Sequence, residues 1–198
     1  MNYNLGYAAR NPEVNELYSN GLHQGVSGIE EGDPNLKPEK AFNNTLSIKG
    51  IVKKRLLLEA IAYFQHFNNY IYLNPQDEIR LTRRGAFPVY KYEQTEADIM
   101  GLDLISSFDF SEQLNAVVKY AYIRGYDRTN GVSLINLPSN KLSSELNYQI
   151  SKVGKFENLQ FQVNNAYVFE QNNILPSQDF SPPPPGYNLV GLKISAEH

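Results

Sequence analysis

Apolar and polar residues alternate along most of this 198-residue chain, and this period of two limits the possible folds more than any other feature. It is clearest in 141–150, where Leu142, Leu146, Tyr148 and Ile150 share one phase and polar residues occupy the other. Such alternation is typical of β-strands whose two faces meet different surroundings. The sequence therefore predicts an all-β antiparallel fold of about eight strands, at 2–9, 42–51, 56–73, 89–110, 114–126, 141–150, 159–169 and 187–196.

The predicted connections alternate between long and short. The long ones are 10–40, 74–88, 127–140 and 171–186, and the short ones are 52–55, 111–113 and 151–158. In an up-and-down array, alternate connections lie at opposite ends of the strands, so one end carries loops and the other tight turns. Outer-membrane barrels have this asymmetry, with long outside loops and short periplasmic turns.

The two faces of the strands fit either a membrane barrel or a soluble sandwich, because alternation alone does not distinguish them. Stretches near 20 residues, 56–73 and 89–110, exceed the usual strand length of soluble sheets and favour the barrel. The alternation slips once near Gly101, which predicts a β-bulge there. With that bulge, the charged residues expected inside are Glu59, Glu96, Asp98, Asp103, Lys119, Lys141 and Glu145. The tyrosines expected on the lipid face are Tyr120, Tyr122, Tyr148 and Tyr167.

Composition excludes several classes of site and partner. The chain has no cysteine, which removes disulfides, a thiol nucleophile and Cys-type zinc sites. The net charge of −3 gives no reason to expect a nucleic-acid partner. His23, His66 and His198 are the only histidines, and none has a Ser or Asp partner at a readable catalytic spacing. The sequence therefore predicts no enzyme, no metal site and no cofactor.

Two motifs flank the first long loop. Tyr7-Ala-Ala-Arg10-Asn-Pro12 leads into Glu16-Leu-Tyr18, and Asp33-Pro-Asn-Leu36-Lys-Pro-Glu39 closes the loop. Their order and spacing closely resemble a signature of TonB-dependent outer-membrane receptors, in which two such boxes flank one extracellular loop. Asn11 separates Arg10 from Pro12, and Asp33 stands where Asn is more usual, so the match is close but incomplete. The signature residues are Arg10, Pro12, Glu16, Leu17, Tyr18, Asp33, Pro34, Asn35, Leu36, Pro38 and Glu39.

The resemblance implies an up-and-down transmembrane β-barrel of about 22 strands that encloses a plug domain. This chain would then be a portion of about eight strands, an internal fragment of the C-terminal half of the barrel that lacks the plug. The implied protein lies in the outer membrane of a Gram-negative bacterium, in contact with its lipid. It would capture a scarce siderophore, cobalamin, heme or glycan, and the TonB complex, acting through the plug, would drive uptake.

Three other functions remain open at this stage. A small closed barrel could act as a structural or adhesion protein of the outer membrane, with its two terminal strands paired. A soluble all-β ligand-binding module would pack its apolar faces together. An outer-membrane hydrolase is the least supported, because the sequence offers no Ser–His pairing.

The candidate ligand-binding residues are polar or aromatic residues in the long connections, where a ligand from outside would arrive. In the heme-uptake branch of the resembled family, a histidine between the two boxes resembles an axial ligand of the heme iron, and His23 stands at that place. The favoured interpretation of His23 is nevertheless an ordinary polar loop residue. Glu30, Glu31 and Asp33 could bind a cation, but without EF-hand spacing solvated charges are favoured. The full set is Tyr18, His23, Glu30, Glu31, Arg83, Arg84, Asp127 and Arg128.

Overall fold

A computed structural model describes residues 1–134, 136–174 and 182–197, and it confirms an all-β fold. Eight long strands follow one another in a single antiparallel sheet in the order β1-β4-β5-β6-β7-β9-β10-β11. Their bounds are β1 Asn2–Arg10, β4 Glu39–Val52, β5 Leu56–Thr82, β6 Gly85–Asp109, β7 Leu114–Asp127, β9 Lys141–Val153, β10 Phe156–Val168 and β11 Tyr187–Glu197. Each corresponds to one predicted strand.

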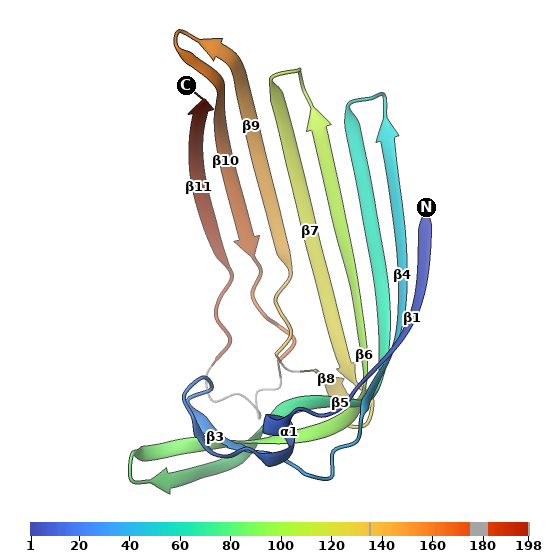
Figure 1. Ribbon diagram of the computed structural model, residues 1–198, viewed down its shortest axis with the longest axis vertical. Coiled ribbons are helices and arrows are strands. Elements are labelled where there is room, and N and C mark those ends of the chain that lie inside the picture. The colour runs from blue at the N-terminus through green and yellow to red at the C-terminus, as the bar shows by residue number, and fades with distance from the viewer. Residues whose placement is uncertain (135, 175–181, 198) are drawn as a thin grey trace.

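The strands stand side by side, with every neighbour antiparallel (Figure 1). Tight turns join β4 to β5, β6 to β7 and β9 to β10 at one end of the sheet, here called the turn end. The longer connections lie at the opposite end, here called the loop end. The connections from β1 to β4 and from β7 to β9 therefore lie at the end opposite the tight turns, as their predicted length indicates. Of the predicted loop 171–186, residues 175–181 lie outside the described part of the chain.

The loop end contains short elements that the alternation did not predict. Helix α1 (Val14–Tyr18), β2 (Asn20–His23) and β3 (Gly28–Glu31) lie between β1 and β4, and β8 (Val132–Ser133) follows β7. We call residues 11–38 the cap. Within the described residues, no helix is long and apolar enough to cross a membrane.

The prediction of a loop at 74–88 was wrong. β5 and β6 continue through it as a paired hairpin, and only Arg83 and Arg84 form its turn. Irregular pairing at Phe67/Tyr70 and Pro75/Ile79 lets the hairpin bend, so that it lies across the loop end of the sheet (Figure 1). The polar composition misled the prediction because these side chains pair with one another and with the cap. We call residues 70–95 the arm.

The predicted bulge at Gly101 was also wrong. Gly101 lies opposite Tyr63 on β5 and Ile123 on β7, with no shift of register at either pair. Instead the Tyr63 ring covers this glycine: a Cβ there would lie 2.1 Å from Tyr63 Cζ. A strand glycine can mark such a close approach as readily as a bulge. Without the bulge, Glu96 and Asp98 lie on the same face as Met100, and Asp103 lies on the other face. The expectation that Glu96 and Asp98 line the interior was therefore wrong.

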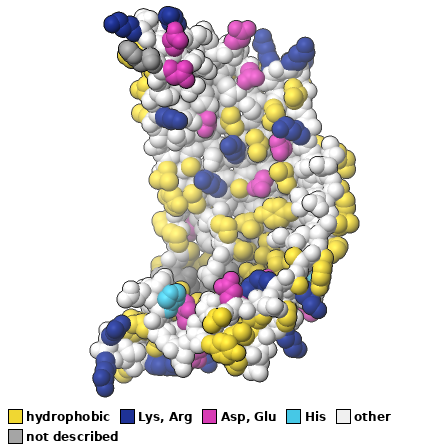
Figure 2. Space-filling view, viewed as in Figure 1, with side chains coloured by type: hydrophobic (Ala, Val, Ile, Leu, Met, Phe, Trp, Pro, Cys, Tyr) yellow, Lys and Arg dark blue, Asp and Glu magenta, His cyan; other side chains and the backbone are white. Residues whose placement is uncertain are grey.

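The cross-strand register gives the sheet an apolar face and a polar face, because directly paired residues point to the same side. Figure 2 is turned toward the polar face, on which charged side chains are spread between the two ends. The apolar face carries Leu46, Ile48, Leu58, Phe64, Met100, Leu104, Val118, Leu146, Phe161, Val163 and Leu192, together with the four predicted tyrosines. The polar face carries Lys49, Glu59, Asp103, Asn115, Lys119, Lys141, Glu145 and Asn164.

The most buried apolar cluster lies on the polar face near the loop end. Ala97, Ile99 and Leu134 are buried there, and Phe67 and Leu137 pack against them. The connection after β7 folds back onto the sheet to reach this position, and the Leu134 N–H donates to the Gly125 carbonyl at 3.1 Å. A Cβ at Gly125 would lie 2.4 Å from a Leu137 methyl group, so this glycine leaves room for the connection.

Candidate functional site

Arg10, at the end of β1, holds the start of the cap in place. Its Nη1 and Nη2 donate to the two carboxylate oxygens of Glu16 at 2.8 and 3.0 Å, and its Nε donates to Glu39 Oε1 at 3.1 Å. The other oxygen of Glu39 accepts the Ile71 N–H at 2.9 Å. One guanidinium and two carboxylates therefore join β1, α1, β4 and the arm, and we call this set the clamp.

Glu16 is almost buried, and its hydrogen bonds keep it ionised. It also accepts the Glu13 N–H at 2.7 Å, which caps the first turn of α1. Burial would raise the pKa of Glu16, but the bonds from Arg10 and from the Glu13 amide outweigh it and leave the pKa below the ordinary value. The same carboxylate thus starts the helix and ties it to β1.

The second motif closes the cap against the helix. The Gly32 N–H donates to the Ser19 carbonyl at 2.7 Å, and the Asp33 N–H donates to the Glu16 carbonyl at 2.9 Å. Asp33 Oδ1 accepts the Asn35 N–H at 2.8 Å, as an Asx turn requires. Both signature motifs therefore have a structural role: they fold the cap.

The cap is joined to the arm by a short stretch of parallel sheet. Ile29, Glu30 and Glu31 of β3 pair with Val89, Tyr90 and Lys91 of β6, and Ile29 and Val89 are buried between them. Arg80 donates to Glu31 at 2.6 Å, and this bond lowers the pKa of the Glu31 carboxyl. Three residue pairs between β3 and β6, together with an ion pair, thus attach the cap to the arm.

An open pocket of about 290 Å³ lies in the cap, lined by Asn15, Ser19, Asn20, Gly21, Leu22, His23 and Glu30. His23 Nδ1 lies 2.7 Å from Glu30 Oε1, with Glu30 buried and the imidazole exposed. A carboxylate in this position orients the ring and leaves Nε2 to face outward. In the described residues, no group of three or more His, Cys, Asp or Glu side chains is arranged to hold a metal ion.

The structure separates the candidate ligand-binding residues into several places. His23 and Glu30 meet at the pocket, Tyr18 is exposed at the end of α1, and Arg83 and Arg84 are exposed at the tip of the arm. Asp127 is buried, and its carboxylate accepts bonds from the Thr95 hydroxyl and from the Thr129 and Asn130 amides. Arg128 lies in the turn after β7 and donates to Asp98, which lies on the apolar face. The last two residues are therefore set apart from the cap.

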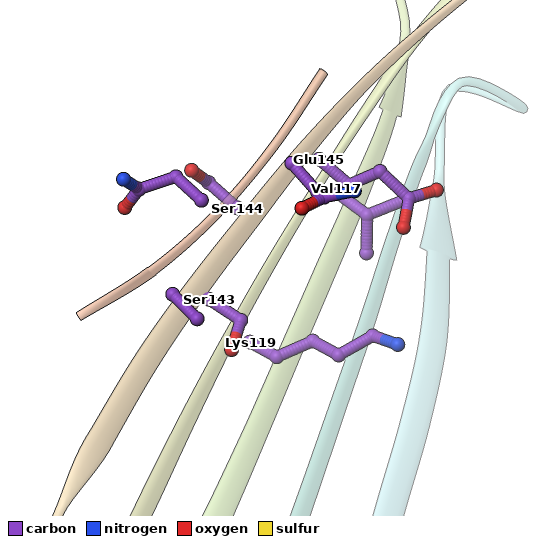
Figure 3. A pocket seen from close by; sticks show the side chains of 8 residues that line it. Val117, Lys119, Ser143, Ser144 and Glu145 are labelled. Atoms are coloured by element: carbon purple, nitrogen blue, oxygen red, sulfur yellow. The ribbon is translucent and has the colours of Figure 1, made fainter. Parts of the chain in front are cut away.

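The polar wall of the sheet has a second, smaller pocket of about 150 Å³ between β7, β9 and β10. Figure 3 shows Lys119 and Glu145 extending to the same side of the sheet there. Lys141 occupies the same face by register, which agrees with the prediction that Lys119, Lys141 and Glu145 share one face.

The family is decided by a comparison with protein-family models. The model described as TonB dependent receptor-like, beta-barrel, matches residues 2–196. This chain belongs to that family. A comparison with curated proteins found none that matches.

Solved structures agree with this family's fold. The copper transporter OprC aligns with 96% of this receptor-like chain and 27% of its own, at 21% identity and a TM-score of 0.74. A mutant of the ferric enterobactin receptor PfeA from Pseudomonas aeruginosa aligns over 96% and 29%, at 18% identity and a TM-score of 0.65. The FrpB iron transporter from Neisseria meningitidis aligns over 98% and 29%, at 15% identity and a TM-score of 0.62. The chain thus spans under a third of each of these structures.

Sequence reasoning about this TonB-dependent receptor-like chain missed several residues that build the loop end. Arg80 and Lys91 both bond to Glu31; Arg80 lies in the segment predicted as a loop, and Lys91 lies in the predicted strand 89–110. Gln94 donates to the Lys37 carbonyl at 2.7 Å and accepts the Lys37 N–H at 2.9 Å, which holds the second motif to the arm. The alternation of β6 placed Gln94 in a strand, but no sequence signal indicated a partner 57 residues away.

The clamp of this receptor-like chain should weaken in acid. The pKa of the Glu16 carboxyl is lower in the folded chain than its ordinary value of 4.5 in the unfolded chain. Such a carboxyl stabilises the fold at a pH above 4.5, and this contribution is lost as the pH falls through the folded-state pKa. We therefore expect hydrogen-exchange protection of the Leu17 and Asp33 amides to fall below about pH 4.5. The Glu16→Gln variant should show lower protection at neutral pH and little further change; a wild-type profile that stays flat to pH 3 would contradict the role of Glu16.

Proposed function

We propose that this chain is part of an outer-membrane receptor of a Gram-negative bacterium. The receptor captures a scarce small molecule or metal chelate at the loop end and passes it inward with energy supplied through TonB. Siderophores, cobalamin, heme and glycans are the ligand classes. Transport of this kind breaks no covalent bond, so the protein is not an enzyme.

The observation that carries this proposal is the rigid surface built at the loop end. The clamp fixes the cap to β1 and β4, and the parallel rungs fix the same cap to the arm. A surface held in place before the ligand arrives loses less entropy on binding. Loops carried on a rigid sheet are where binding residues usually lie.

Two parts of this surface are suited to a ligand. The cap pocket offers His23, oriented by Glu30, and amide groups from Asn15 and Asn20. The arm tip offers the exposed cations Arg83 and Arg84. An imidazole can donate a nitrogen lone pair to a metal centre, and a guanidinium recognises carboxylate or phosphate oxygens. An anionic metal chelate presents both a metal centre and anionic oxygens, so we favour this ligand class over the others.

The test uses the full-length receptor in detergent. Binding of ferric enterobactin, hemin, cyanocobalamin and maltoheptaose is measured by calorimetry for wild type, for His23→Ala and for Arg83→Gln/Arg84→Gln. For the ligand that binds, we expect at least one of these variants to weaken affinity about tenfold, which corresponds to about one charged contact. The Lys53→Gln/Lys54→Gln variant, which changes two cations at the turn end, is the matched control and should bind as wild type does.

The outcomes separate this function from its alternatives. A receptor that stays in solution without detergent would indicate a soluble binding module. A protein that inserts into lipid but binds none of the four probes would favour the structural or adhesion barrel. For hemin, identical Soret spectra of wild type and His23→Ala would exclude His23 as a heme ligand.

A further inference from the structure

The small sheet at the loop end has two outer edges, and one of them is blocked. Its strand order is β2-β3-β6-β5, because β3 lies between β2 and β6. Beyond Asn68, β5 pairs with β6 alone among the described residues, so its other side is an edge. The Ile71 N–H on that side donates to Glu39 at 2.9 Å, and Pro75 has no N–H to offer. Both features discourage pairing with another strand.

The edge formed by β2 carries neither of these features. Within the described residues β2 pairs only with β3, and its sequence Asn20-Gly-Leu-His23 contains no proline, lysine or arginine. β3 is in turn paired with β6, which holds the edge in place. An unprotected edge presents main-chain N–H and C=O groups to any strand that reaches it.

The ladder between β2 and β3 shows which groups face outward. The Gly32 N–H donates to the Ser19 carbonyl at 2.7 Å, which identifies a bonded pair next to the ladder. Bonded and non-bonded pairs alternate between antiparallel strands, so Gly21, two residues farther along, bonds to β3. The N–H and C=O groups of Asn20 and Leu22 therefore point away from β3. Four main-chain groups on one edge are thus available to a partner.

Gly21 leaves the face beside this edge open. Its φ of 151° is one that other residues rarely adopt, and a Cβ there would meet no heavy atom within 4 Å. A glycine inside a strand often marks a place where another backbone approaches closely. The cap pocket of about 290 Å³ follows the same edge, because all four residues of β2 line it.

Glu30 gives this open face a preference for positive charge. Glu30 is paired with Gly21, so its side chain lies on the same face, and that side chain is 6% exposed. Its Oε1 lies 2.7 Å from His23 Nδ1, which leaves Oε2 for a ligand. A strand added to β2 would lie two strand spacings, about 10 Å, from β3. A lysine side chain on that strand can meet the Glu30 carboxylate above Gly21, where no side chain intervenes. Buried carboxylates are usually paired, so such a cation is favoured.

We propose that β2 binds an extended peptide as an added antiparallel strand, with a basic residue opposite Gly21. The residues on either side of the basic residue bond to the main chain of Asn20 and Leu22, and the basic side chain reaches Glu30. Main-chain bonds supply affinity in this mode of recognition, and the open space above Gly21 supplies selectivity. The inference rests on the proposed function and deepens it, because it places a peptide chain within the ligand that arrives at the loop end.

The test measures binding of a synthetic peptide to the full-length receptor in detergent. The parent peptide is acetyl-Thr-Val-Lys-Val-Thr-amide, and two analogues carry an N-methyl group on both valines or on the lysine. In the added strand the valine N–H groups face β2 and the lysine N–H faces away. We therefore expect methylated valines to weaken binding about tenfold or more, and a methylated lysine to leave it unchanged.

Hydrogen exchange on the same complex locates the peptide. Bound peptide should slow exchange of the Asn20 and Leu22 amides, which face outward. The Gly21 amide already bonds to β3 and should change little. This alternation along three successive residues would not arise from a ligand held by side chains alone.

A variant of β2 tests the edge itself. Leu22→Pro removes an outward N–H that the cap does not use, and proline is tolerated at such a position on an edge strand. We expect Leu22→Pro to bind the parent peptide about tenfold more weakly than wild type. Leu22→Ala loses the same side chain but keeps the N–H, so it should bind at least about threefold more tightly than Leu22→Pro. Unchanged exchange of the Ile29 amide, in the strand held by β6, would show that both variants keep the cap.

The outcomes separate this site from the proposed function. Equal binding of the parent peptide and of the analogue with methylated valines would overturn the edge site. Protection of the Asn20 and Leu22 amides before any peptide is added would also overturn it, because another segment of the receptor would then occupy the edge. A receptor that binds one of the four ligands named above but not the parent peptide would overturn this site alone. A receptor that binds the peptide at this edge yet stays in solution without detergent would support the edge site and contradict the proposed function.

Discussion

Replacing Arg10 with alanine is expected to open the cap while the rest of the sheet stays folded. The change leaves the Glu16 and Glu39 carboxylates, both about 10% exposed, facing each other without their shared cation. Removing one partner of a buried ion pair costs about 3–5 kcal/mol, and the 40% exposure of Arg10 reduces this to about 2–3 kcal/mol. Hydrogen exchange at the Ile71 amide, which donates to Glu39, measures this opening directly.

Two comparisons make the Arg10 result specific. Arg10→Lys keeps the charge but not the two-pronged contact to Glu16, so we expect an intermediate loss of protection. Lys49→Ala removes an exposed partner of Glu59 at 3.4 Å on the polar face and should cost less than about 1 kcal/mol. Wild-type protection of the Ile71 and Leu17 amides in Arg10→Ala would show that the clamp does not hold the cap.

Gly32→Ala is expected to disturb the cap by a different route. A Cβ at this position would lie 2.5 Å from the Leu17 carbonyl carbon and from the Tyr18 amide nitrogen. These are backbone atoms of α1, so the clash cannot be relieved by turning a side chain, and the helix must move. Overpacking of this kind costs about 1–3 kcal/mol. We expect faster exchange of the Gly32 and Asp33 amides and faster proteolysis within residues 14–33.

The control for this change is Gly50→Ala, near the end of β4, where an added Cβ meets no heavy atom within 4 Å. The Gly50→Ala variant should match wild type in both measurements. A difference between Gly32→Ala and Gly50→Ala would therefore reflect the close approach of Gly32 to the helix. If Gly32→Ala keeps wild-type exchange at Asp33, whose amide bonds to the Glu16 carbonyl, the tight packing of the second motif on α1 is wrong.

The alternation of residues was enough to predict the strands and their order. Leu142 and Leu146 lie opposite Tyr120 and Ala116 on the apolar face, as their shared phase requires. The connection lengths then separated the loop end from the turn end. Both features are local: a period of two needs only neighbouring residues, and a tight turn needs only a short polar segment.

The cap, the arm and Gly101 could not be predicted in the same way, because they depend on contacts between distant segments. Glu16 and Glu39 look like ordinary charged loop residues until Arg10 is placed between them. The polar stretch 74–88 lies in a paired hairpin, and its Arg80 bonds to Glu31, which is 49 residues away in the sequence. The slip of pattern near Gly101 was real, because Asp98 lies on the apolar face with His66 and Arg128 as partners. The glycine itself leaves room for the Tyr63 ring and does not mark an extra residue.

The parallel rungs between β3 and β6 impose an order on folding. The pairs β4–β5, β5–β6, β6–β7 and β9–β10 are joined by tight turns, so these hairpins can form with short loops to close. Until β4, β5 and β6 have paired, the contact between Ile29 and Val89 must close a loop that contains all of β4 and β5, which costs chain entropy. We therefore expect the cap to assemble late, after the strands that carry it. A slow final phase in refolding, seen at the Ile29 amide after the β5–β6 amides are protected, would be its kinetic sign.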